Sequence, residues 1–495
     1  MAYVTINAYD ADLRIPEFTG IMQYGDGINA DPRTASMAYN MDTSGGVLRP
    51  AADHTLLTPS VAAPIETLAS LYRRWYSGSG DKTVLIAAAG GQLYYMIVGG
   101  TAWTQMALPS GWVGTGYASN VWSYVAYEIK PEGSTDPVDV LLLSNFQDGM
   151  IYVRGDNLTV AKVTTPKKFG VIARYAERIW GGGIIDDPDT LVYSAPFDPL
   201  DWAANAEIPE DGAGDVMQPS WDGDSFHAMM PLGSQLIAFK KNRIWRIMNT
   251  DPSQYVFKEQ YGGGTAYFNT IAVDRERILM LGESGVMQYD GLSAAPYSQE
   301  VCKDIWDSMN IAALHQACAC IWGDCYFLAV PTGTSLYNNA VVVYNIRENT
   351  WLYRNNVAVE SFLPTDEKLY FTNHATPGRI YEWGDDAWES GAAVPASWTG
   401  QWSDFSQKAM LKGGFDVYMA VEAQGDVTIN ISMETEKKLK TKECVFPDTS
   451  TRKAIQKRIH FGGAGRRFRL LISSDATDAW RIVGGIQVRA EIDPD

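Results

Sequence analysis

The chain has 495 residues, of which 46% are hydrophobic and 20% charged, with 45 glycines, 26 tyrosines and 16 tryptophans. This composition supports a large folded core and excludes a disordered chain, and its glycine and aromatic content favours sheets joined by tight turns. The formal net charge of −18 argues against a general nucleic-acid binder, because neutralising phosphates requires a clustered basic surface.

The acidity is concentrated in the first four fifths of the chain. Residues 395–495 contain 15 Lys and Arg and 13 Asp and Glu, which leaves 25 basic and 45 acidic residues for positions 1–394. The N-terminus has no basic and apolar signal segment, and no apolar run approaches the ~20 residues that span a bilayer. We therefore expect synthesis in the cytoplasm and no membrane partner.

The first 62 residues are punctuated by Gly, Asp and Pro, as in Gly25-Asp26-Gly27 and Asp31-Pro32-Arg33. Little hydrophobic periodicity survives in this stretch. We predict an extended N-terminal arm over residues 1–62 that packs over the fold or reaches a neighbouring subunit.

Residues 63–394 are a series of apolar hairpins. Residues 275–291, for example, form two short apolar runs around Gly282-Glu283-Ser284-Gly285. Candidate sheets end near residues 107, 163, 203, 258, 297, 355 and 388, a mean spacing of about 47 that is typical of propeller blades. A hairpin cannot bury its apolar face alone, so the series predicts an all-β fold, a β-propeller of six or seven blades, with a double sandwich as the alternative. Residues 307–314 are the expected short helix.

Beyond Pro395 the predicted strands become longer, at residues 415–423, 427–434, 455–460, 468–473 and 482–490. We predict a separate C-terminal β-sandwich over residues 395–495 with one exposed basic hairpin. Its lysines could contact a partner or simply lie on a solvated surface. They are Lys437, Lys438, Lys440 and Lys442.

Two groups of carboxylates are candidate acidic channel or loop positions. They are Asp186, Asp187 and Asp189 in one group, and Asp222 and Asp224 in the other. Paired acids can cleave glycosides or bind calcium. However, Pro188 and Gly223 mark both groups as turns, where Asp caps its own backbone.

The five cysteines and five histidines suggest neither a metal nor a catalytic site. Cys318, Cys320 and Cys325 with His315 lack the paired C-x-x-C spacing of a zinc site, so buried free thiols are expected. No histidine accompanies a G-x-S-x-G or H-E-x-x-H motif. We predict that the chain is not an enzyme and has no cofactor.

Several segments together resemble structural proteins of the tail hub or nozzle of short-tailed phages. They are Gly45-Gly46-Val47-Leu48-Arg49-Pro50, Arg178-Ile179-Trp180 leading to Tyr193-Ser194-Ala195-Pro196-Phe197-Asp198-Pro199, residues 239–247, 285–291 and 465–473. The resemblance implies a virion protein of the tail, a propeller-bearing subunit in a homo-oligomeric ring, expected to be a hexamer, around a DNA channel. It further implies contacts with a portal-adaptor ring and with tail fibre or needle proteins. No motif of that family maps onto individual functional residues here.

Two functions remain open at this point. The first is a structural tail component whose acidic wall repels phosphate, so that viral DNA slides through without sequence-specific binding. A neutral or basic lumen would contradict that hypothesis. The second is a carbohydrate-binding or glycan-cleaving propeller for receptor recognition, with Trp202, Trp221 and Trp388 stacking on sugars.

Overall fold

The computed structural model describes residues 11–23, 27–57, 59–74, 82–112, 122–131, 136–217, 223–249, 252, 255–261, 263–298, 301–449 and 454–493. Within these ranges the chain is almost entirely β-structure, with two short α-helices, α1 (Lys303–Asp307) and α2 (Ala387–Ser390). This confirms the predicted all-β class. No helix in the described ranges has the length and hydropathy needed to cross a membrane.

Seven four-stranded antiparallel sheets, which we call the sheet series, follow one another in the described chain. The first three are β6 (Ile65–Arg73), β7 (Lys82–Ala89), β8 (Gln92–Ile97), β9 (Thr104–Gln105); β10 (Ser123–Ile129), β11 (Val138–Asn145), β12 (Gly149–Arg154), β13 (Val160–Lys162); and β14 (Val171–Tyr175), β15 (Arg178–Gly182), β16 (Thr190–Tyr193), β17 (Gly214–Met217). The fourth and fifth are β18 (Ala228–Leu232), β19 (Gln235–Phe239), β20 (Arg243–Met248), β21 (Val256–Tyr261); and β22 (Ala272–Asp274), β23 (Arg277–Gly282), β24 (Gly285–Tyr289), β25 (Ala294–Pro296). The last two are β26 (Cys318–Trp322), β27 (Cys325–Val330), β28 (Ala340–Asn345), β29 (Thr350–Asn355); and β30 (Val359–Pro364), β31 (Leu369–Asn373), β32 (Ile380–Glu382) with β5 (Thr55–Leu57).

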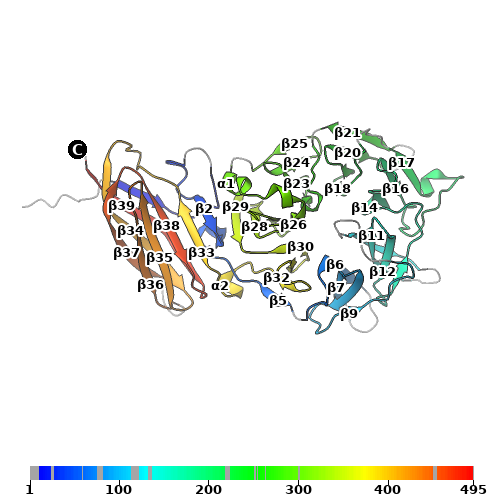
Figure 1. Ribbon diagram of the computed structural model, residues 1–495, viewed down its shortest axis with the longest axis horizontal. Helices are drawn as coiled ribbons and strands as arrows, with labels where there is room; N and C mark the ends of the chain where they lie inside the picture. The colour runs from blue at the N-terminus through cyan, green and yellow to red at the C-terminus, as the bar shows by residue number, and fades with distance from the viewer. Residues whose placement is uncertain are drawn as a thin grey trace, which may run out of the picture.

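The sheets are arranged around a ring (Figure 1). Separate apolar cores fill most of the spaces between consecutive sheets, so the strands are buried on both faces and read as continuous apolar runs such as Val84 to Ala89. The core between the fifth and sixth sheets, which includes Leu281 and Leu328, is continuous with the core of the two sheets formed largely by the C-terminal residues. One core joins the first sheet to the last, since Leu68 and Leu85 pack with Leu363 and Tyr370. Burial of this apolar surface is the main force that holds neighbouring sheets together.

The last sheet is completed by a strand from the N-terminal region. Strand β5 pairs antiparallel with β32, placing Leu57 opposite Ile380 and Leu56 opposite Tyr381. Strand β5, which precedes the first sheet of the ring in the sequence, therefore covers the outer edge of the last sheet. A covered edge cannot pair with a second chain.

Two further sheets, which we call the C-terminal sheet pair, lie beside the ring (Figure 1). One has the order β1 (Ala11–Ile15), β39 (Trp480–Asp493), β34 (Leu411–Ala423), β37 (Ile455–Gly465). The other has the order β2 (Ala35–Tyr39), β33 (Ala396–Gly400), β38 (Phe468–Ser474), β35 (Val427–Thr435), β36 (Leu439–Phe446). Alternating apolar side chains of both sheets share one core, including Val417, Ile431 and Val488.

The described part of the predicted N-terminal arm is distributed over both regions. Strands β1 and β2 pair with β39 and β33, while β3 (Met41–Asp42) and β4 (Arg49–Pro50) form a small hairpin between the two regions. The buried Arg354 of the sheet series donates a 2.6 Å hydrogen bond to the Met41 carbonyl. The segment therefore fastens the C-terminal sheet pair to the ring.

Some predictions from local pattern were wrong in detail. The helix expected over residues 307–314 is instead α1, which ends at Asp307, followed by a 3₁₀ helix at Ile311–Gln316. The chain is extended between them because the Asn310 amide donates to the Pro331 carbonyl at 2.9 Å. The third sheet was expected to end near residue 203, but its fourth strand is β17, which ends at Met217.

Candidate functional site

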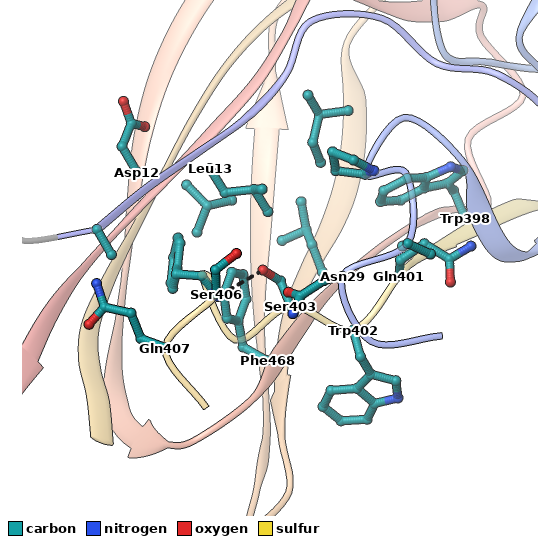
Figure 2. A pocket seen from close by; sticks show the side chains of 18 residues that line it. Asp12, Leu13, Asn29, Trp398, Gln401, Trp402, Ser403, Ser406, Gln407 and Phe468 are labelled. Carbon is teal, nitrogen blue, oxygen red and sulfur yellow. Dashed lines mark hydrogen bonds between the residues drawn. The ribbon is translucent and has the colours of Figure 1, made fainter. Parts of the chain in front are cut away.

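A cavity of about 430 Å³ opens between the two sheets of the C-terminal sheet pair (Figure 2). Its walls come from β1, from residues 29–32, from the segment 398–407 that leaves β33, and from Phe468 and Leu470 of β38. The N-terminal segment thus supplies one wall and the C-terminal sheets supply the others. Sequence analysis did not identify this cavity, because its walls are separated by almost 400 positions.

The rim of the cavity is held by a network around Asp404. Its carboxylate accepts a 2.7 Å hydrogen bond from Asn29 Nδ2 and a 2.8 Å bond from the Ser406 amide. Phe405 and Ser406 both have positive φ, at 54° and 62°, a conformation that costs energy for residues other than glycine. The Asp404 bonds hold this strained turn in place, so the rim has a fixed shape.

Aromatic side chains form much of the wall. Phe405 packs on Phe468 with ring centroids 4.6 Å apart, and Trp398 is 1% exposed with an indole Nε1 that has no hydrogen-bond partner. Trp402 points away from the group around Leu13 and Ser406 (Figure 2). The Arg469 guanidinium lies 4.7 Å from the Trp402 ring centre. Aromatic faces beside polar groups are the usual lining of a small-molecule site.

The polar lining offers binding groups rather than a reaction centre. Asp12 is the one carboxylate among the described lining residues, and it accepts hydrogen bonds from Gln487 Nε2 at 2.8 and 2.9 Å. Glycoside cleavage generally requires two carboxyl groups across the bond. The cavity can bind a small polar molecule, but it shows no such pair among these residues.

The predicted acidic positions meet at a buried lysine. Asp189, in the turn before β16, forms an ion pair with Lys240, and the Asp224 carbonyl accepts a 2.8 Å hydrogen bond from the same Lys240 ammonium. The side chain of Lys240 is fully buried and also lies 4.7 Å from the Phe226 ring centre. Two acidic turns that are 35 positions apart are therefore joined by one cation.

The other predicted acids differ in their surroundings. Asp187 pairs with Lys167, and this hydrogen bond holds the pKa of the Asp187 carboxyl below its usual range. Asp224 also contacts His227 Nε2 at 3.0 Å, whereas Asp186 is exposed. Asp222 lies outside the described residues. Asp187 and Asp189 are thus each paired with a lysine, and a role of the predicted set in a DNA channel stays a prediction.

The predicted lysine arm is the β35–β36 hairpin at the edge of the five-stranded sheet. Lys437 and Lys438 lie in its turn, Lys440 and Lys442 lie on β36, and all four are exposed. Strand β36 pairs with β35 on one side, with Lys442 opposite Ile431. An exposed edge strand that carries lysines resists pairing with the edges of other sheets, so these charges also have a structural role.

The predicted sugar-stacking tryptophans are poorly placed for that role. Trp202 is buried, where its indole donates a 3.0 Å hydrogen bond to the Pro199 carbonyl. One face of Trp388 is covered by Arg481, whose guanidinium carbon lies 4.2 Å from the ring centre. Trp221 lies outside the described residues.

All five cysteines are free thiols. Cys318 and Cys320 lie in the core between the last two sheets, and burial raises the pKa of both thiols well above the usual range. No group of three or more His, Cys, Asp or Glu side chains suited to a metal ion occurs in the described ranges.

Sequence analysis also missed a pair of glutamates at the junction of the first and last sheets. Glu66 and Glu360 each lie at a bulge in the innermost strand of their sheet, β6 and β30, which contact each other. Burial, together with the Glu360 carboxylate, raises the pKa of Glu66 to about 7. A bulge can turn a side chain to a different face, and neither bulge is signalled by the local sequence.

No family model and no curated protein matches this chain. Among solved structures it is similar to the Neurospora crassa Pan2 WD40 domain, at 11% identity and a TM-score of 0.37, over 66% of this chain and 90% of that chain. It is also similar to BBS1N in complex with ARL6DN, at 10% identity and a TM-score of 0.41, over 69% and 99%. The β-propeller domain of the Trilobed protease from Pyrococcus furiosus matches at 12% identity and a TM-score of 0.32, over 63% and 95%. At these identities the similarity is one of fold.

Proposed function

We propose that the sheet series is a seven-bladed β-propeller, that the C-terminal sheet pair is a β-sandwich, and that the chain is a ring-forming structural subunit of a phage tail hub or nozzle. In this function it is a virion protein and not an enzyme. The homo-oligomeric ring, expected to be a hexamer, lines the DNA exit channel. Its neighbours are a portal-adaptor ring and tail fibre or needle proteins.

The observation that carries this proposal is the path of the N-terminal segment. Within residues 11–57 the chain pairs with β39, with β33 and with β32, so one segment ties the sandwich to the propeller and closes the last blade. A subunit built in this way resists separation of its two regions under load. Such rigidity suits a ring through which a genome is forced.

The charge distribution agrees with this function. Positions 1–394 hold 45 acidic and 25 basic residues, so the propeller repels phosphate and DNA can pass without being held. Exposed carboxylates such as that of Asp186 can repel phosphate, whereas the Asp189 carboxylate is paired with Lys240. Passage therefore depends on net charge and needs no base contact.

Electron microscopy of the purified full chain tests the proposal. We expect closed rings with a central channel, together with a mass of about six chains by light scattering. Duplex DNA should bind weakly and without sequence preference at low salt, because an acidic lumen offers few phosphate contacts. A chain that stays monomeric at high concentration, or a ring whose lumen is basic, would refute the proposal.

The cavity between the two C-terminal sheets favours a second candidate function, carbohydrate binding without cleavage. It combines aromatic walls, including Phe405 and Trp398, with the amide side chains of Gln401 and Gln407. Its volume of about 430 Å³ suits one or two sugar rings. The site lies in the sandwich and not on the tryptophans predicted from the sequence.

Tryptophan fluorescence titrated with a panel of soluble oligosaccharides tests this second function. A saturable signal that Phe405→Ala and Gln407→Ala weaken, and that Trp388→Ala leaves unchanged, would support it. Trp388 is a matched control because it is an aromatic residue outside the cavity. If no sugar binds at millimolar concentration, this candidate is rejected and the structural function is unaffected.

A further inference from the structure

The loop between β16 and β17, residues 197–213, and β17 itself form an unusually exposed surface, which we call the acidic loop (residues 197–217). It holds six carboxylates and no Lys or Arg. Phe197 and Met217 are 74% and 61% exposed, and Ile208 is also exposed. Exposed apolar side chains that gather in one segment mark interaction surfaces more often than those scattered singly over a protein.

The acidic loop is held firmly from below. The buried Arg178 donates hydrogen bonds from Nη1 to the carbonyls of Ser194, at 2.7 Å, and Gly212, at 2.6 Å. Trp202 is buried beneath it and packs on Phe169 with ring centroids 5.2 Å apart. An anchored loop binds a partner without first losing conformational freedom, which favours affinity.

Phe197 has a conformation that its packing does not explain. Its φ is +61°, and its amide donates a 2.8 Å hydrogen bond to the Glu177 carbonyl, which fixes the backbone while the ring projects into solvent. A left-handed backbone at a bulky aromatic residue is unfavourable. Strain at an exposed aromatic side chain points to a binding role.

A surface of opposite charge lies on the C-terminal sheet pair. We call the β35–β36 hairpin over residues 436–446 the basic edge; it contains the four exposed lysines described above and the exposed Leu439 and Val445, with Leu439 58% exposed. On the neighbouring β37, Lys457 adds further positive charge, and its ammonium lies 4.6 Å from the Phe446 ring centre. Side chains alternate along β36, so Leu439 and Val445 lie on one side of this edge strand while Lys440 and Lys442 lie on the other. A loop that straddles the free edge can contact both sides.

The two surfaces lie far apart in one subunit. Strands β16 and β17 lie at one end of the long axis and β36 lies at the other (Figure 1). They cannot meet within one chain, but they can meet between two chains arranged head to tail. Repeated contacts of this heterologous kind generate a ring when the rotation closes.

We propose that the acidic loop of one copy docks on the basic edge of a second copy, with Phe197, Ile208 and Met217 packing against Leu439 and Val445 while the lysines pair with the loop carboxylates. This inference rests on the proposed ring-forming function and names its subunit contact. A second copy fits the basic edge better than DNA does. The exposed Leu439 and Val445 gain nothing from a phosphate backbone, whereas the apolar side chains of the acidic loop can cover them.

Sedimentation velocity of the full chain with paired charge reversals tests the contact. Lys440→Glu with Lys442→Glu on the basic edge, and Glu207→Lys with Glu210→Lys on the acidic loop, should each weaken self-association about tenfold or more. Combining all four changes in one chain should restore association, because the charges are then exchanged. Lys162→Glu with Lys168→Glu, two exposed lysines of the sheet series, gives the same change in net charge as the basic-edge variant and should have little effect.

A further variant separates docking from general electrostatics. Phe197→Asn keeps a residue that tolerates positive φ but removes the ring, and it should weaken association at 0.5 M salt as well as at low salt. Circular dichroism confirms folding of every variant. Because the changed side chains are exposed, the thermal unfolding midpoint of each variant should match that of the unmodified chain.

The outcomes distinguish this contact from the proposed function. Rings that persist unchanged in both charge-reversed variants overturn the contact and leave the ring-forming function intact. If the chain with all four charge reversals associates into open filaments, the contact is supported and a closed ring is contradicted. If Lys440→Glu with Lys442→Glu abolishes DNA binding in a gel-shift assay but leaves association unchanged, the basic edge binds nucleic acid and the contact is rejected. A monomeric unmodified chain also rejects it.

Discussion

The fully buried ammonium of Lys240 forms an ion pair with the carboxylate of Asp189, which belongs to the preceding sheet. The same ammonium donates a 2.8 Å hydrogen bond to the Asp224 carbonyl in the connection between the two sheets. One cation therefore links the third and fourth sheets and the chain that joins them. Among the carboxylates predicted as candidate channel positions, Asp189 therefore has a structural role, because it helps to hold the two sheets together.

Replacing Lys240 by Met should destabilise the protein. The change leaves Asp189 and the Asp224 carbonyl without their cation in a partly buried place, which costs about 3 kcal/mol. Urea unfolding followed by intrinsic fluorescence measures the loss as a lower midpoint. Lys241→Ala is the control, because Lys241 is exposed and its backbone amide, which donates to Asp224, is retained. Equal midpoints for the two variants would disprove this account.

Replacing Arg178 by Met should loosen the acidic loop. The guanidinium is the donor that holds the carbonyls of Ser194 and Gly212, and no water can replace it without opening the buried site. Hydrogen exchange measured by mass spectrometry should show amides of residues 198–211 exchanging at least tenfold faster. Arg174→Ala, which removes an exposed guanidinium from the adjoining strand, should leave that exchange unchanged.

Stability should fall as pH rises from about 4.5 to about 7 through Glu66. Its pKa is about 7 in the folded protein against 4.5 when unperturbed, so in this range the folded chain binds the proton and the unfolded chain does not. Glu66→Gln removes that dependence and should raise the thermal midpoint at pH 8 but not at pH 4. Glu66 is only half-buried, so the expected gain is about 1 kcal/mol. A variant with an unchanged pH profile would contradict the assignment.

The thiols should react very slowly in the native protein. Burial raises the pKa of Cys325 to about 11 and that of Cys302 and Cys318 further, so almost no thiolate is present at pH 8. With a thiol-specific chromogenic reagent we expect Cys325, the least buried, to react first and all five to react at once in urea. Rapid native labelling of Cys318 would show that the core between the last two sheets opens readily.

Local sequence was a good guide where each sheet is made of consecutive strands. Sheets were expected to end near residues 107, 163, 297 and 355, and the structure ends them at Gln105, Lys162, Pro296 and Asn355. The hairpin around Gly282 and Gly285 was also predicted correctly, with β23 and β24 in register across it. Alternation, apolar runs and turn residues are local signals, and these sheets are locally paired.

Predictions from the sequence failed where a segment packs against or pairs with a distant part of the chain. The third sheet was expected to end near residue 203, yet Trp202 anchors the acidic loop inserted before β17. The final sheet was expected to end near residue 388, but its last strand is β5, more than 320 positions earlier. The run from Gln401 to Gln407 contains an Asp-x-Ser turn signal, and nothing in it indicates that residues 29–32 complete a cavity there.

The amino-acid sequence by itself determined the all-β class, the repeated hairpins, the exposed lysines from Lys437 to Lys442 and the excess of acid before residue 395. These are consequences of which residues stand next to one another and of how many charges there are. Only the tertiary structure decided that Asp189 meets Lys240, that Glu66 lies at the same junction as Glu360, and that the acidic loop and the basic edge lie at opposite ends. These contacts depend on how the sheets close into a ring. Ring closure is driven by the burial of apolar surface between segments that are distant in the sequence, and no local sequence pattern encodes that burial.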